Sequence, residues 1–97
     1  MRVLDPEGAH LAALLRLGDF HGLRVLEAGC GDGRLTVGIA AKAGSLLAFD
    51  PDATAIERAR RLLPAELAGR VEYRIASGTQ ISLDPRSFDV TVFSWSL

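Results

Sequence analysis

Three glycines that alternate with other residues constrain the fold of this chain more than any other feature of its sequence. Gly29, Gly31 and Gly33 follow a stretch that reads as a short buried strand, Arg24–Glu27, and precede residues 35–43, which read as a mostly apolar helix. A strand, a glycine-rich turn and a helix in this order bring bare backbone N–H groups up to a ligand. Glycine also permits positive φ angles and leaves room for a ligand against the main chain. The sequence therefore predicts a ligand-binding turn between a buried strand and a helix.

The spacing of the glycines differs from that of the dinucleotide-binding fingerprint G-x-G-x-x-G/A. That fingerprint needs a third small residue at position 34, where this chain has Arg34. Here the third glycine is Gly33, and an acid, Glu27, precedes the first glycine by two positions, so the pattern is E-x-G-x-G-x-G. This pattern, with its flanking strand and helix, resembles motif I of the class I (Rossmann-like) S-adenosylmethionine-dependent methyltransferases. A glycine-rich turn that binds nothing is the alternative.

A second acid, Asp50, follows the apolar stretch 45–49, which reads as the next strand. A carboxylate at this point can accept two charge-assisted hydrogen bonds from the cis-diol of a ribose whose other end lies on the glycine turn. Asp50 could also cap the helix that follows, and the two roles are compatible. We expect an adenosine-type ligand across the carboxyl ends of the strands.

The resemblance implies further roles, position by position. Glu27 matches the motif I acid, which in the family helps to orient the methionine moiety. Gly29 and Gly31 match the backbone that passes the ribose and the amino-acid part of the cofactor. Asp50 matches the ribose acid, and Pro51 stands where a side chain packs on the adenine.

Two later segments also align with the family. Ala76-Ser77-Gly78 takes the place of a segment whose acid contacts the adenine amine, and Ser77 replaces that acid with a hydroxyl, a weaker acceptor. Phe93-Ser94-Trp95 aligns with motif IV, near the methionine end and the substrate. The predicted cofactor-binding residues are Glu27, Ala28, Gly29, Cys30, Gly31, Asp50, Pro51, Ser77, Gly78 and Ser94.

Strands and helices alternate along the chain, which favours an α/β fold with a parallel sheet. Strands are predicted over residues 24–27, 45–49, 71–75 and 88–95. The resemblance implies a Rossmann-like three-layer sandwich with strand order 3-2-1-4, truncated relative to the seven-stranded family fold. Residues 1–97 then form a single, partial S-adenosylmethionine-binding domain.

Helix signals separate these strands. A helix is expected to begin at Asp5-Pro6-Glu7, and the helix after the glycine turn is expected to end near residue 43, with Gly44 as its C-terminal stop. In the next helix, an apolar face is predicted to include Ile56 and Leu62, and Pro64 ends the helix.

The last predicted strand, Phe88–Trp95, is apolar and has no Lys or Pro after Phe88. It is expected to be an open edge on the side where the family's fifth strand belongs. An unprotected edge of this kind pairs with other chains. The sequence therefore predicts self-association through Phe88–Trp95.

Composition excludes several classes of function. The net charge of −1 gives no electrostatic basis for binding nucleic acid or an anionic membrane, and 48% hydrophobic residues indicate a packed core. The one cysteine, Cys30, cannot form an internal disulfide, and without a leader signal in the sequence a cytoplasmic location is expected. Neither His10 nor His21 has a partner at metal-like spacing, so no metal is expected. Cys30 has no evident His partner and is not expected to be a nucleophile, although a helix N-terminus could lower its pKa.

The expected function is transfer of a methyl group from S-adenosylmethionine to an unidentified small-molecule acceptor. This chain would supply the cofactor-binding half, would be inactive alone, and carries no assigned catalytic residue. An intact enzyme completed by a partner subunit is a second possibility. A non-catalytic binding or oligomerisation module on a degenerate nucleotide-binding scaffold is a third. An NAD-dependent oxidoreductase domain is disfavoured by Arg34.

Overall fold

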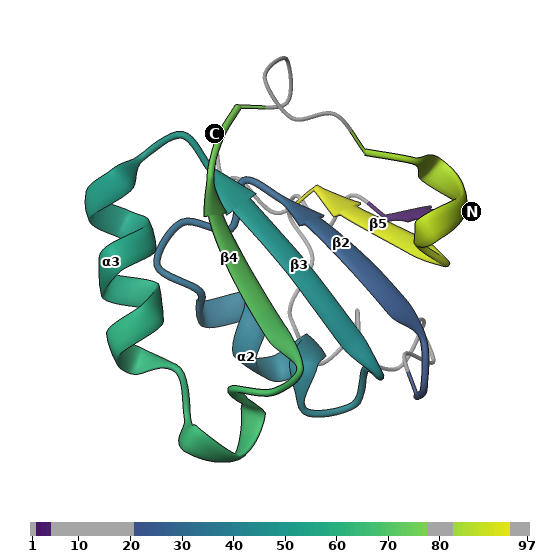
Figure 1. Cartoon of the computed structure of the whole chain (residues 1–97), viewed down its shortest axis with the longest axis horizontal. Helices are drawn as coiled ribbons and strands as arrows, with labels where there is room; N and C mark the ends of the chain where they lie inside the picture. Colours follow the sequence, from purple (N-terminus) through teal and green to yellow (C-terminus); the bar gives the residue numbers. More distant parts are fainter. Residues whose placement is uncertain (1, 5–20, 78–82, 94–97) are drawn as a thin grey trace.

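A computed structural model of the chain describes residues 2–4, 21–77 and 83–93, which build a parallel sheet with two α-helices against one face (Figure 1). The elements in chain order are β1 (Arg2–Leu4), β2 (Arg24–Ala28), α2 (Arg34–Ala40), β3 (Ser45–Asp50), α3 (Ala53–Leu62), η1 (Ala65–Leu67), β4 (Val71–Ile75), η2 (Pro85–Ser87) and β5 (Val90–Phe93). The helix predicted to begin at Asp5 lies outside the described residues.

The sheet has the order β1-β5-β2-β3-β4, and all of its strand pairs are parallel. Without β1 this is the predicted order 3-2-1-4, which is confirmed. In the register, Ala28 lies opposite both Phe49 and Phe93, and Asp50 lies opposite Ile75. The carboxyl ends of β2, β3, β4 and β5 therefore meet at one edge of the sheet.

The strand β1 corrects the prediction of an open edge at the last strand. Arg2–Leu4 pairs in parallel with Val90–Val92, on the side of β5 that faces away from β2. Peptide groups at a sheet edge need hydrogen-bond partners, and here the amino-terminal residues of the same chain meet that need. The predicted self-association through Phe88–Trp95 therefore loses its structural basis, and residues 94–97 lie outside the described part of the chain.

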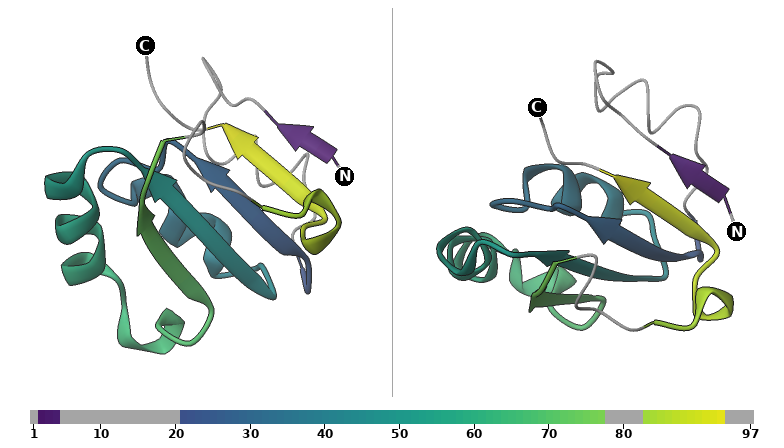
Figure 2. Two further views of the ribbon diagram at one scale, coloured as in Figure 1. Left: turned by 45° about the horizontal axis from the view of Figure 1, so that its top comes forward. Right: turned by 90° about the horizontal axis from the view of Figure 1, so that it is seen from above.

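Both α-helices pack on the same face of the sheet. The inward residues of the strands alternate along each strand, as expected when one face is buried. Together with residues of α2 and α3 they form one core cluster, which includes Val25, Ile39, Ala40, Leu46, Ala48, Ile56, Ala59, Tyr73, Val90 and Val92. Figure 2 shows the connection that contains η2 on the side of the sheet opposite α2.

Leu62 departs from the predicted apolar face of its helix, because its side chain is 62% exposed. α3 ends at this residue, and Leu63 has an extended backbone before Pro64. The change of direction lets Leu63 pack against the core in its place. Ile56, six residues earlier, is fully buried as predicted.

Gly44 has a different role from the predicted helix stop. α2 already ends at Ala40, and Gly44 is not among the glycines with positive φ. Its N–H donates to the carbonyl oxygen of Leu23 at 2.9 Å, and a Cβ atom at this position would lie 2.8 Å from the carbonyl oxygen of Gly22. Gly44 is thus required because two backbone segments approach closely there.

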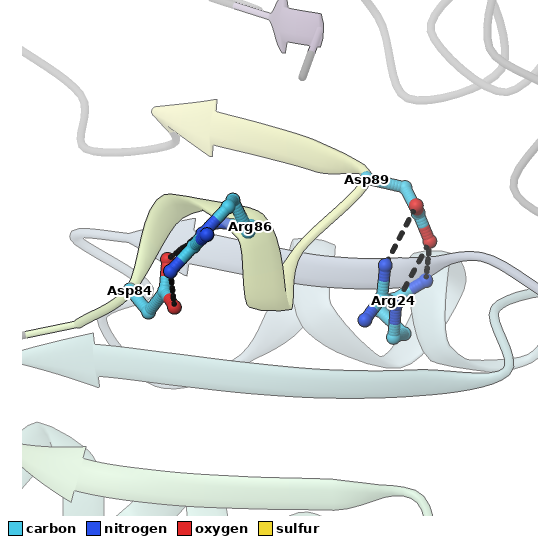
Figure 3. A network of polar contacts seen from close by, with 4 residues as sticks. All are labelled: Arg24, Asp84, Arg86 and Asp89. Atoms are coloured by element: carbon cyan, nitrogen blue, oxygen red, sulfur yellow. Dashed lines mark hydrogen bonds and ion pairs between the residues drawn. The ribbon is translucent and has the colours of Figure 1, made fainter.

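An ion pair joins the starts of β2 and β5 (Figure 3). Arg24 donates from Nε to Oδ2 of Asp89 at 3.2 Å and from Nη2 to Oδ1 at 3.1 Å, while its backbone N–H donates to Oδ2 at 2.9 Å. The Asp89 N–H returns a bond to the carbonyl oxygen of Arg24 at 2.8 Å. The Arg24 guanidinium holds the pKa of Asp89 below its usual value. These reciprocal bonds fix the register of β5 beside β2.

Candidate functional site at the carboxyl edge of the sheet

The glycine turn has a backbone that other residues rarely adopt. Gly29, Gly31 and Gly33 have φ angles of 76°, 57° and 86°, and among the described residues only glycines have positive φ. The N–H groups of Gly29 and Cys30 both donate to the carbonyl oxygen of Phe49, at 2.9 and 3.2 Å. The turn is therefore folded onto the carboxyl end of β3.

Asp50 lies against this turn. Its Oδ2 accepts a hydrogen bond from the N–H of Gly31 at 2.9 Å, and its Oδ1 accepts one from the N–H of Asp52 at 2.9 Å. A carboxylate has about four acceptor positions, so each oxygen keeps one for a ligand. Two free acceptor positions on one carboxylate suit a vicinal diol, and the prediction that places Asp50 at the mouth of the turn agrees with this geometry.

Capping of α3 falls to Asp52, which settles the alternative that Asp50 serves as the helix cap. The side chain of Asp52 accepts hydrogen bonds from the N–H groups of Thr54 and Ala55, at 3.0 and 3.2 Å. These are two of the donors that a helix start leaves without partners. Asp50 is thereby left to hold the turn.

Gly31 and Gly33 face opposite surroundings. A Cβ atom built on Gly31 meets nothing within 4 Å, so this backbone borders open space. A Cβ atom on Gly33 would lie 2.6 Å from Oη of Tyr73 and 3.2 Å from Cβ of Ala59. Gly31 is therefore the position where a ligand can approach the main chain, whereas Gly33 packs the turn onto β4 and α3.

Glu27 lies beneath the turn and not at its open mouth. Its side chain is completely buried, and its Oε1 accepts a hydrogen bond from Oγ1 of Thr36, which is also completely buried. The bond joins the end of β2 to the first turn of α2. A role for Glu27 in orienting a ligand stays a prediction, and any such role is exerted from below the glycine backbone.

Cys30 is a buried thiol that stays protonated at neutral pH. Burial, together with the nearby carboxylates of Glu27 and Asp50, raises its pKa to about 12. The suggestion that a helix N-terminus could lower this pKa is wrong, because burial and negative charge outweigh it. The expectation that Cys30 is not a nucleophile agrees with this result.

Cys30 should therefore react slowly with iodoacetamide in the folded chain. Because the thiolate is the reacting species, a pKa of about 12 leaves almost none of it at pH 8. We expect labelling in denaturant to be at least about 100-fold faster than in buffer, as a pKa shift of several units implies. Mass spectrometry of timed samples measures both rates, and equal rates would show that the thiol is exposed and ionisable.

The remaining predicted residues gather around Asp50 to different degrees. The N–H of Ala76 donates to the carbonyl oxygen of Asp50 at 3.0 Å, which brings the half-buried Ser77 near the exposed Pro51. Ala28 is buried at the end of β2. Two predicted residues, Gly78 and Ser94, lie outside the described part of the chain.

Sequence reasoning missed two buried polar residues under the turn, Thr36 and Tyr73. Thr36 is a hydroxyl-bearing residue among apolar neighbours at the start of a helix, and that contrast was a usable signal. Tyr73 occupies an inward position of β4, where alternation alone predicts only an apolar side chain. Their partners come from other elements, so spacing along the chain could not show them.

Two hollows lie away from this site, at the amino-terminal edge of the sheet. The larger has a volume of about 540 Å³ and is bounded by the first residues of β3 and β4, with Phe88 beside them. The carboxylates and the glycine N–H groups lie at the opposite edge of the sheet, so the glycine turn is a better candidate for the ligand site than this hollow. In the described ranges, no group of three or more His, Cys, Asp or Glu could hold a metal ion, and no helix has the length and hydropathy to cross a membrane.

Comparison with known proteins gives matches in sequence. A family model described as a methyltransferase domain matches residues 25–97. A magnesium-protoporphyrin O-methyltransferase of Rhodobacter capsulatus is 35% identical over 79 residues, which are 81% of this chain and 34% of that protein. The chain thus spans about a third of this curated relative's length.

Solved structures match in fold. An S-adenosylmethionine-dependent methyltransferase of Mesorhizobium loti superposes with a TM-score of 0.72 and 27% identity, over 86% of this chain and 36% of that one. Phosphoethanolamine N-methyltransferase 1 of Haemonchus contortus was solved with phosphoethanolamine and S-adenosylhomocysteine. It superposes with a TM-score of 0.75 and 25% identity, over 86% of this chain and 17% of that one. Magnesium protoporphyrin IX methyltransferase of Synechocystis, solved with S-adenosylmethionine, superposes with a TM-score of 0.69 over 86% of this chain and 39% of that one. Because the two sequences are 22% identical, this likeness concerns the fold alone.

Proposed function

Because this chain belongs to the methyltransferase domain family, whose methyl donor is S-adenosylmethionine, we propose that its glycine turn and Asp50 hold that donor. The methyl group would pass to a small-molecule acceptor. The curated relative is named for magnesium-protoporphyrin, a small molecule, which supports this class of acceptor. We further propose that the chain supplies the cofactor-binding half of the enzyme.

The contact between Asp50 and Gly31 carries this proposal. Asp50 would accept hydrogen bonds from the two ribose hydroxyls at its remaining acceptor positions, while the open space beside Gly31 admits the ligand to the backbone. Pro51 is exposed next to Asp50 and would pack on the adenine, with Ser77 accepting from its amine. Glu27 would orient the methionine moiety from beneath the turn.

The donor supplies the reactive group, because a methyl on a sulfonium is already activated for transfer. The contribution of the protein is to hold donor and acceptor in line and to exclude water. Asp50, Gly31 and Pro51 would hold the nucleoside end of the donor and so limit the movement of its sulfonium end relative to the acceptor. A protonated Cys30 next to the turn takes no part in the transfer, since it presents no nucleophile.

Calorimetric titration of this chain with S-adenosylmethionine, S-adenosylhomocysteine and NAD tests the proposal. We expect heat of binding with the first two ligands and none with NAD, because Arg34 stands where a dinucleotide site needs a small residue. A methylation assay with this chain alone should be silent. Binding of none of the three would support a non-catalytic module, and binding of NAD alone would support an oxidoreductase domain.

We also propose a cytoplasmic protein that acts without nucleic acid or membrane. Its net charge of −1 and its single, buried cysteine support this location. Cell fractionation of a tagged chain, with filter binding to DNA and RNA, tests both points.

A further inference from the structure

The phenol of Tyr73 is a buried polar group that has lost its hydrogen bonds to water. The side chain is 6% exposed on the inward side of β4, and its Oη makes no hydrogen bond to any described residue. Burial raises the pKa of Tyr73 to about 12, and the side chain of Thr36 acts to lower this pKa. The Thr36 hydroxyl therefore lies near the phenol. The pair nevertheless falls short of hydrogen-bond geometry.

A buried hydroxyl of this kind needs an explanation. An unpartnered hydroxyl destabilises the fold, whereas a phenylalanine ring would fill the same space without that cost. The backbone around it is held firmly, since Nη2 of Arg60 donates to the carbonyl oxygen of Tyr73 at 2.9 Å. The hydroxyl therefore brings no benefit in the ligand-free protein.

Three polar side chains from three elements lie in a row beneath the turn. Oγ1 of Thr36 donates its proton to Glu27, and its oxygen keeps lone pairs that can accept a further bond. The Oη of Tyr73 has a proton to give, and it lies directly under Gly33, where a Cβ atom would be 2.6 Å away. Gly33 is the N-cap residue of α2 and Thr36 lies in its first turn, so a movement of the glycine turn would also change the distance between the two hydroxyls.

We propose that Tyr73 is a positioning residue for the cofactor site, which acts through Thr36 on Glu27. When a ligand settles on the glycine turn, Oη of Tyr73 donates to Oγ1 of Thr36, and the row Tyr73–Thr36–Glu27 closes. Closure links β4, α2 and β2 under the backbone that carries the ligand. The inference rests on the proposed function, because it requires that the turn hold S-adenosylmethionine or its product.

Raman spectroscopy tests this inference directly, because Tyr73 is the single tyrosine of the chain. The intensity ratio of the two bands of the tyrosine ring doublet reports whether a phenol donates a hydrogen bond. We expect saturating S-adenosylhomocysteine to shift this ratio from that of a free phenol to that of a donor. Tyr73→Phe should weaken binding about two- to tenfold, the range of one neutral hydrogen bond, while the melting temperature holds or rises.

Two substitutions of Thr36 provide the matched controls. Thr36→Ser keeps the hydroxyl and should keep the Raman shift and the affinity, whereas Thr36→Val should lose both. The inference is overturned if Tyr73→Phe binds as tightly as the parent chain, or if it loses affinity and melting temperature together. An unchanged Raman ratio in a chain that binds the ligand overturns the inference alone, whereas a parent chain that binds neither ligand overturns the proposed function with it.

Discussion

Replacement of Gly33 by Ala is expected to lower the free energy of unfolding by about 2–4 kcal/mol, which combines backbone strain with overpacking. The φ angle of 86° is unfavourable for any residue with a side chain. The new methyl group would also stand 2.6 Å from Oη of Tyr73, well inside van der Waals contact. Urea unfolding followed by circular dichroism measures the loss.

Gly31→Ala is the matched control for this prediction. Gly31 shares the positive φ angle but has no atom within 4 Å of the position its Cβ would take, so only the backbone strain of about 1–2 kcal/mol applies. The double variant Gly33→Ala/Tyr73→Phe should recover part of the loss, because the next ring atom lies at 3.4 Å. Equal losses for the two alanine variants would show that Tyr73 does not press on the turn.

The resemblance to the methyltransferases implied the strand order, whereas the parallel sheet and the place of Asp50 follow from local patterns. Apolar runs that alternate with helical periodicity indicate a parallel sheet, and in such a sheet the residues after each strand collect at one edge. Asp50 was therefore expected near Gly31, whose N–H donates to its carboxylate. The N–H groups at the start of α3 donate to the carboxylate of Asp52 instead, which stands two residues later. The predicted motif and the observed turn agree at this level.

Other features depended on contacts that no local pattern encodes. Three residues, Arg2–Leu4, are too few to show a strand period, so the pairing that covers β5 could not be anticipated. Helical spacing placed Leu62 on the apolar face but carries no information on where the core ends. Spacing also treats Gly31 and Gly33 alike, although one borders open space and the other packs on Tyr73.

Asp50→Ala should weaken binding of S-adenosylhomocysteine by about 5- to 150-fold, which corresponds to about 1–3 kcal/mol for lost charge-assisted hydrogen bonds. Two effects act in the same direction. The ribose hydroxyls would lose their acceptor, and the N–H groups of Gly31 and Asp52 would lose the carboxylate that holds the turn in place. Calorimetric titration of the parent and variant chains measures the change.

Asp52→Ala separates binding from folding, because it removes the neighbouring carboxylate and leaves Asp50 intact. Loss of the α3 cap should lower the free energy of unfolding by about 0.5–2 kcal/mol, while the affinity changes little. The affinity of Asp50→Asn should lie between those of the parent chain and Asp50→Ala. Its amide oxygen can still accept a hydrogen bond from one backbone N–H, but it carries no charge. If Asp50→Ala binds the ligand as tightly as Asp52→Ala does, the ribose assignment is wrong, and the contact between Asp50 and Gly31 serves only to hold the turn against β3.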